Sequence, residues 1–299
     1  MPNTQLYTIP PIRWFVLGLI VLGFSVPTLL YLGAESLDNG IPSYWSWLIG
    51  ALGFQLAFLM VSLVFIRWNK LNTKALFGRP VLYDVGVAVE FSFVNIALTY
   101  VVLYALYFPL SYSADYQSWV VSLLLEAPSI ILYDGNHFPI FANLVSFASI
   151  VVFAPLIEEF VFRGVIYARL NQKYTVWVAV FVSSLLFGLL HGEVFSAALF
   201  GALLCYSYQK SGRLIVPIII HSLNNLTVWL VMAWDAMVHG KLTLYSLTQF
   251  QSEWRYGLYA AFAISVWAIY CLARKSTLFT LPATNTSKSV STSQQTEVV

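Results

Sequence analysis

Residues 45–68 read WSWLIGALGFQLAFLMVSLVFIRW, and no charged residue occurs in this run before Arg67. A helix of about 20 apolar residues crosses the hydrocarbon core of a bilayer, because each residue adds about 1.5 Å of length. The sequence therefore predicts an all-α integral membrane protein with about eight transmembrane helices. The eight apolar stretches are 12–33, 45–68, 85–112, 138–158, 175–190, 194–208, 214–234 and 256–273.

The composition of the whole chain agrees with this prediction. Of the 299 residues, 59% are hydrophobic and 9% are charged, whereas a soluble domain carries about 25% charged residues. The net charge of +2 offers no basic surface to nucleic acid, so the expected partner is the lipid bilayer. Cys205 and Cys271 both lie in apolar stretches, and we expect two buried small side chains rather than a disulfide.

Lys and Arg residues predict the orientation of the chain. All fifteen except Lys241 and Arg255 fall on one side of the predicted bundle, which the positive-inside rule assigns to the cytoplasm. The protein is therefore expected in the plasma (inner) membrane with both termini cytoplasmic. Residues 1–275 are predicted to form one polytopic domain, and the Ser- and Thr-rich stretch 276–299 a disordered cytoplasmic tail.

The residues that can carry chemistry are concentrated in the later spans. Three groups stand out: EEFVFRG at 158–164, FGLLH at 187–191 and HSLNN at 221–225. An ionisable side chain in the apolar core costs about 2.5–3.5 kcal/mol on insertion scales, so those that remain usually face an interior and serve a function. The functional core is therefore expected in the four spans from Phe138 to Trp234.

Helical spacing separates the adjacent glutamates. Residues four apart share a helical face, whereas neighbours point about 100° apart. Glu159 can therefore pair with Arg163 along its own helix, while Glu158 must point elsewhere. His221 and Asn225 are also four residues apart and share a face.

Counting residues from the predicted turns suggests that these groups meet. Glu158 lies fifteen residues before the turn at 173–174, and His191 lies seventeen residues after it. In an antiparallel pair of helices these positions have nearly equal height, about 23–25 Å from the turn. With His221 and Asn225 on the next helix, all four side chains are expected to line one cavity nearer the cytoplasmic side.

The three groups resemble, in order, the signature motifs of the CAAX-protease and bacteriocin-processing family of intramembrane proteases. The resemblance rests on three stretches, 158–164, SLLFGLLH at 184–191, and RL at 213–214 followed by His221 and Asn225, and it covers 155–227. The first three spans and the last one match no motif. Ordered motifs of this number are a specific signal, whereas a single Glu-Glu pair is not.

The resemblance implies hydrolysis of a peptide bond within the membrane. In this interpretation Glu158 is the general base for a water that His191 also holds, and His221 and Asn225 hydrogen-bond the oxyanion. Glu159 and Arg163 support the site structurally. The implied substrate is a membrane-embedded or lipidated protein or peptide, as in CAAX processing or in the maturation of bacteriocins and other peptides.

Metal dependence remains open between two forms of this mechanism. An older view of the family makes Glu158, His191 and His221 ligands of zinc, and these residue types do bind zinc. The HExxH arrangement of zinc proteases is absent from the sequence. The interpretation that we favour needs no metal and no cofactor, and zinc is the alternative.

Two other classes of function fit parts of the pattern. A proton-coupled transporter also places glutamates and histidines inside a bundle, and Glu90 in the third span, which matches no motif, would suit one. A catalytically inactive scaffold of the same family is the second alternative. Taken alone, His221 with Asn225 could be polar contacts between spans, and Glu159 with Arg163 an ordinary intrahelical pair.

The distribution of Lys and Arg predicts the topology directly. Cysteines introduced at Lys74, Lys173 and Gly212 should be protected from an impermeant thiol reagent in intact cells, and cysteines at Asn39 and Asp115 should be labelled. Labelling of the 173 and 212 positions from opposite sides of the membrane would contradict both the topology and the height comparison.

Overall fold

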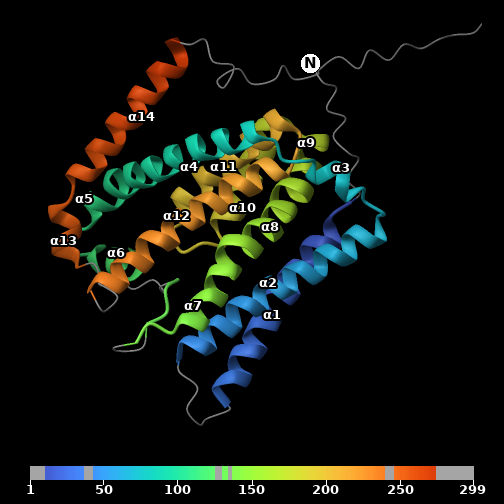
Figure 1. The fold of residues 1–299 in the computed structure, drawn as a ribbon, viewed down its shortest axis with the longest axis horizontal. Helices are drawn as coiled ribbons and strands as arrows, with labels where there is room; N and C mark the ends of the chain where they lie inside the picture. Colours follow the sequence, from blue (N-terminus) through green and yellow to red (C-terminus); the bar gives the residue numbers. More distant parts are fainter. Residues whose placement is uncertain (1–10, 37–42, 125–129, 134–136, 240–245, 274–299) are drawn as a thin grey trace, which may run out of the picture.

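The computed structural model describes residues 11–36, 43–124, 130–133, 137–239 and 246–273, and the regular structure of these residues is helical (Figure 1). Large hydrophobic side chains such as Trp14, Phe24 and Phe93 are exposed on these helices, as expected where a bilayer is the solvent. The predicted all-α membrane fold is confirmed. Five of the described helices are long and apolar enough to cross a membrane: Arg13–Ala34, Leu48–Trp68, Leu82–Leu110, Ile140–Lys173 and Ile215–Val238.

Three of the eight predicted spans are not among these five. The stretch 175–190 forms α10 (Val176–Gly188), which has 13 residues and is short for a bilayer. The other two form α11 (Val194–Ser211) and α14 (Arg255–Ala273), with 18 and 19 residues. The total of eight spans therefore stays a prediction.

The structure tests some of the other expectations and leaves others outside the described residues. Cys205 is buried and unpaired, as predicted. The side chain of Cys271 and the predicted tail 276–299 lie outside the described residues. The stretch before the fourth span contains a short helix, α6 (Gln117–Leu124).

The first two spans form a hairpin along one side of the molecule (Figure 1). The helices α1 (Arg13–Ser36) and α2 (Ser43–Trp68) approach closely at Gly53, where a Cβ atom would lie 2.7 Å from Leu30 Cδ1. The hairpin reaches the later spans through α2, which packs against α8 (Ala154–Glu159). The helix α2, which lies outside the motif region, therefore packs against the segment that carries Glu158 and Glu159.

The fourth span is one helical run whose α-helical winding is interrupted twice. It contains two π-helical segments, and the Glu-Glu pair lies in the single α-helical segment between them. A π-helical turn shifts the backbone hydrogen bonds by one residue and often marks a functional site. The five segments are α7 (Ile140–Phe147), η2 (Ala148–Phe153), α8, η3 (Phe160–Tyr167) and α9 (Ala168–Lys173).

The turns after this run lie at the positions that were assumed in comparing the heights of Glu158 and His191. The run ends at Lys173, and α10 begins after Thr175, whose Oγ1 accepts a hydrogen bond from the Val178 N–H. The next helix, α11, ends at Gly212, which has a left-handed φ of 66° that glycine adopts without strain. From there α12 (Ile215–His239) runs back through the bundle and packs against α11, α8 and α4 (Leu82–Val102).

An ion pair joins the beginnings of α4 and α12. Arg213 donates from both terminal nitrogens to the nearly buried Asp84 carboxylate, at 2.7 and 3.1 Å, and also to the Arg79 carbonyl. The same carboxylate accepts a hydrogen bond from the Val81 N–H at the start of α4. Asp84 therefore holds together the entries of two spans.

Removal of this carboxylate should destabilise the fold. Asp84→Ala leaves the Arg213 guanidinium and the Val81 N–H without their acceptor, and we expect a loss of about 1–3 kcal/mol in the free energy of unfolding. Thermal unfolding of the purified protein in detergent measures it. Asp115→Ala, at an exposed position, is the matched control, and equal melting temperatures for the two variants would contradict the role of Asp84.

Candidate active site

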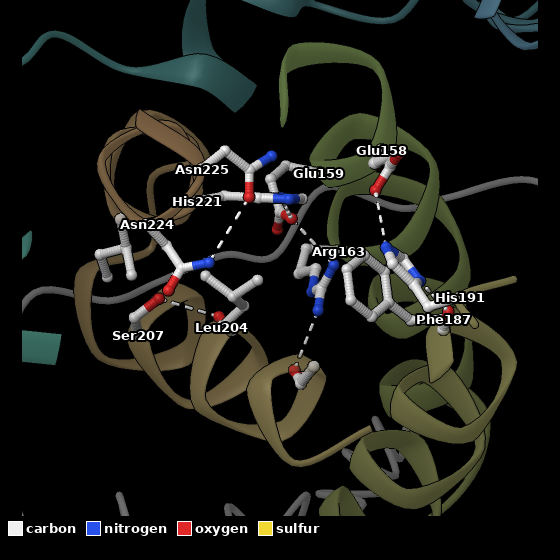
Figure 2. A network of polar contacts seen from close by, with 12 residues as sticks. Glu158, Glu159, Arg163, Phe187, His191, Leu204, Ser207, His221, Asn224 and Asn225 are labelled. Carbon is white, nitrogen blue, oxygen red and sulfur yellow. Dashed lines mark hydrogen bonds and ion pairs between the residues drawn. The ribbon is translucent and has the colours of Figure 1, made fainter. Parts of the chain in front are cut away.

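The structure brings Glu158 and His191 together from two different spans. Glu158 lies on α8, His191 follows α10, and Glu158 Oε2 is 4.0 Å from His191 Nε2 (Figure 2). The Oε2 atom is buried and has no hydrogen-bond partner among the described residues. A buried carboxylate oxygen is normally paired, so this atom is left available for a ligand or a water.

The hydrogen bond on the far side of its ring fixes the tautomer of His191. His191 Nδ1 lies 2.8 Å from the Phe187 carbonyl oxygen, and a carbonyl only accepts, so Nδ1 carries the proton. In the neutral ring the Nε2 atom then has a free lone pair directed towards Glu158. The site thus presents two hydrogen-bond acceptors to whatever lies between them.

The second glutamate of the pair is completely buried and holds two partners. Glu159 Oε1 accepts a hydrogen bond from Arg163 Nη1 at 2.9 Å and one from His221 Nδ1 at 2.8 Å (Figure 2). Arg163 is also fully buried, and its other terminal nitrogen donates to the Gly201 carbonyl at 3.1 Å. The predicted Glu159–Arg163 pair is present, and the bond to His221 is an addition that the sequence did not indicate.

This bond limits what His221 can do. Because Nδ1 donates to the Glu159 carboxylate, the neutral ring has no proton on Nε2. His221 can donate from Nε2 only as the doubly protonated imidazolium, and Glu159 then lies beside the positive charge as its counter-ion. The carboxylate therefore sets the orientation and the tautomer of this ring.

Asn225 is held by the backbone of the fourth span. Its Nδ2 donates to the Ile150 carbonyl in η2 at 2.9 Å. That carbonyl lacks a helical donor because the N–H of Ala154 binds Ser149, and Pro155, one residue further, has no N–H. The contact links α12 to η2 and occupies one of the two Nδ2 hydrogens.

All four predicted residues line one cavity of about 340 Å³. Glu158, His191, His221 and Asn225 reach it from α8, the turn after α10, and α12. The convergence expected from residue counting is therefore observed, although their chemical roles are a separate matter. The wall also contains Gln55 of α2, which the sequence analysis did not select.

Two further glutamates are used elsewhere. Glu90 accepts a hydrogen bond from Trp267 Nε1 of α14 at 2.7 Å and is not among the residues that line the cavity. Glu193 caps α11 through the N–H groups of Phe195 and Ser196, and accepts the Tyr107 hydroxyl at 2.7 Å. Glu193 thereby anchors the turn that carries His191; its place just before an apolar helix was the available signal.

Fold and site together define a multi-pass, all-α membrane protein with a carboxylate and two histidines around a cavity inside its bundle. Residues 140–227, which contain all four cavity residues, match the family described as "Type II CAAX prenyl endopeptidase Rce1-like". This segment is therefore similar to the CAAX-protease and bacteriocin-processing family.

Two relatives agree with this assignment. The chain is 38% identical over 104 residues to the membrane-embedded CAAX protease MroQ of Staphylococcus aureus, which covers 32% of this chain and 40% of the relative. It is 31% identical over 77 residues to YdiL of Bacillus subtilis, named as a membrane peptidase, over 25% of this chain and 32% of the relative. The chain thus spans less than half the length of the curated relatives it matches. No solved structure matches it significantly.

The buried ion pair predicts a sharp difference between the adjacent glutamates. Glu159→Gln should lower the free energy of unfolding by about 3–5 kcal/mol, because Arg163 keeps a buried charge without a counter-ion. Glu158→Gln, in which Oε2 loses no protein partner, should melt close to the wild-type temperature. Thermal unfolding in detergent compares the two variants.

The double variant Glu159→Gln with Arg163→Met is the control for this explanation. It removes both charges, so it should be more stable than Glu159→Gln alone. A double variant less stable than either single variant would show that the charge imbalance is not the cause.

Proposed function

We propose that this protein is an intramembrane endopeptidase that hydrolyses a peptide bond of a membrane-embedded or lipidated protein or peptide with a water activated by Glu158 and His191. The observation that carries the proposal is the 4.0 Å separation of two free acceptor atoms, Glu158 Oε2 and His191 Nε2, on the wall of the cavity. One water can lie about 2.8 Å from both atoms. With each of its hydrogens bound to one acceptor, its lone pair is directed at a substrate carbonyl.

The chemical steps follow from these positions. The water oxygen attacks the scissile carbonyl carbon, its proton passes to Glu158, and the carbonyl oxygen becomes an oxyanion. His221, as the imidazolium, and the second N–H of Asn225 donate to this oxygen. The C–N bond then breaks, and Glu158 returns its proton to the departing amine, which leaves a carboxylic acid and an amine; the acid then loses its remaining proton to water.

The arrangement of the same atoms supports the form without a metal. Zinc lies about 2.0–2.2 Å from nitrogen and oxygen ligands, so a tetrahedral ion places two such ligands about 3.3–3.5 Å apart. A separation of 4.0 Å between Glu158 Oε2 and His191 Nε2 would need an angle at the ion of about 130° or more, which is wider than the tetrahedral angle. No group of three or more His, Cys, Asp or Glu among the described residues is arranged to hold a metal. These two observations support the proposal of a mechanism without zinc.

The transporter alternative receives no support from the cavity. A proton path would need further ionisable groups beyond the site, and Glu90 was the candidate. Its carboxylate is engaged with Trp267 on the opposite helix of the α4–α14 pair. Only a measurement of peptidase activity distinguishes an inactive scaffold from a peptidase.

The proposal predicts complete dependence on Glu158 and none on a metal. Purified protein in detergent, treated with a strong chelator, should cleave a member of a library of palmitoylated peptides. Glu158→Gln should lower kcat/KM by at least about 1000-fold without loss of stability, because no base remains for the water. Cleavage is followed by mass spectrometry of the products.

Three results would contradict parts of this proposal. Full activity of Glu158→Gln removes Glu158 as the base. Activity that is lost on chelation and restored by zinc would show that the reaction depends on a metal ion. Cleavage of no peptide by the wild-type protein, with a proton-linked solute flux in vesicles that Glu158→Gln abolishes, favours the transporter.

A further inference from the structure

Gln55 is a polar side chain in the middle of a membrane-spanning helix. It lies on α2, outside the matched segment 140–227, in a run whose neighbours are apolar. A polar residue at such depth usually faces the interior of the bundle and has a function. Gln55 lines the same cavity as Glu158 and His191.

Gln55 and Asn225 are held in the same way by consecutive carbonyls. Gln55 Nε2 donates to the Ser149 carbonyl at 3.1 Å, and Asn225 Nδ2 donates to the Ile150 carbonyl at 2.9 Å. Both carbonyls belong to the π-helical segment η2 on the wall of the cavity. The irregular winding of η2 thus anchors one amide from α2 and one from α12.

Each anchored amide keeps hydrogen-bonding capacity. A primary amide has two N–H donors and a carbonyl acceptor, and among the described residues the Gln55 side chain bonds only to Ser149. One N–H and the Oε1 atom of Gln55 therefore remain for a molecule in the cavity. A donor and an acceptor on one planar group are the complement of a backbone peptide group.

We propose that Gln55 is a substrate-binding residue that pairs with a backbone amide of the peptide substrate beside the bond that is cut. The inference rests on the proposed peptidase function and adds the residue that holds the substrate backbone. Binding through backbone atoms requires the substrate to be unwound at this point, because a helical peptide has no free N–H or carbonyl there. The α2 wall is thus a contact surface for an extended peptide segment.

Steady-state kinetics with a palmitoylated peptide that the wild-type protein cleaves can test this. Gln55→Met has a similar length but no amide, and it should raise KM about tenfold with kcat changed less than about twofold, as expected for a hydrogen bond kept from the bound substrate to the transition state. Gln55→Asn, which keeps the amide but is one methylene shorter, should raise KM several-fold. The matched control is Gln251→Met, since Gln251 also donates to a backbone carbonyl, that of Ser111, away from the cavity.

Substrates with single ester bonds in place of backbone amides test the contact itself. An ester bond lacks the N–H group that would donate a hydrogen bond to Gln55 Oε1. Each peptide of the series carries its ester at a different position beside the scissile bond. One of these esters should weaken binding to the wild-type protein and cause no further loss of binding in Gln55→Met. A purely structural role for Gln55 would not produce this selective loss.

The outcomes separate the two proposals. Unchanged KM in both Gln55 variants, or equal losses for every ester in wild type and Gln55→Met, overturns the role of Gln55 while wild-type cleavage leaves the peptidase intact. If Gln55→Met melts far below Gln251→Met, Gln55→Asn and the wild-type ester series decide. Absence of wild-type cleavage overturns the proposed function first.

Discussion

The Glu159 carboxylate has no contact with solvent, and the arrangement of the site depends on how its charge is satisfied. One oxygen accepts from Arg163 on its own helical run and from His221 on α12. Arg163 continues the chain of contacts to the Gly201 carbonyl on α11. A buried charge is tolerated only with well-placed partners, and the Glu159–Arg163 pair thereby links three helical runs. Any shift of α12 would break the bond that orients the His221 ring.

The free glutamate is a consequence of the same constraint. Because Glu159 is committed to the interior pair, the helical rotation of about 100° per residue turns Glu158 onto another face. That face meets His191 at the cavity. Adjacent residues of one type thus acquire different surroundings: Glu159 binds Arg163 and His221 through Oε1, whereas Glu158 lines the cavity beside His191. The Glu-Glu pair is informative in the sequence because a single helix can serve an ion pair and a cavity only in this way.

The sequence predicted those parts of the structure that depend on local spacing. The all-α fold, the Glu159–Arg163 pair and the turns near Lys173 and Gly212 follow from apolar run lengths, the helical repeat and the punctuation between helices. Residue counting along two helices was enough to place Glu158 and His191 at one level. Contacts between segments far apart in the chain could not be obtained in this way. The Glu159–His221 bond joins residues 62 positions apart, and the Asn225–Ile150 bond joins residues 75 apart.

The role of Gln55 was hidden for a different reason. In the run 45–68 a single glutamine is compatible with lipid contact, a helix interface or a cavity, and only the position of η2 distinguishes these. Within the π-helical winding, Pro155 lacks the N–H that Ile150 would have bound, which leaves this carbonyl to Asn225.

The buried Glu159 contacts and η2 also distinguish two parts of the bundle. The groups that could act on water lie in the matched segment, where their positions are bound to one another through Glu159 and η2. The opposite wall of the cavity comes from α2, which packs on α8 without sharing the buried ion pair. Under the proposed function, substitutions on α2 are expected to alter the surface offered to a peptide without removing a partner from the buried Glu159, Arg163 and His221 side chains. In the proposed peptidase, chemistry and selection of the substrate would be carried by different helices of one cavity.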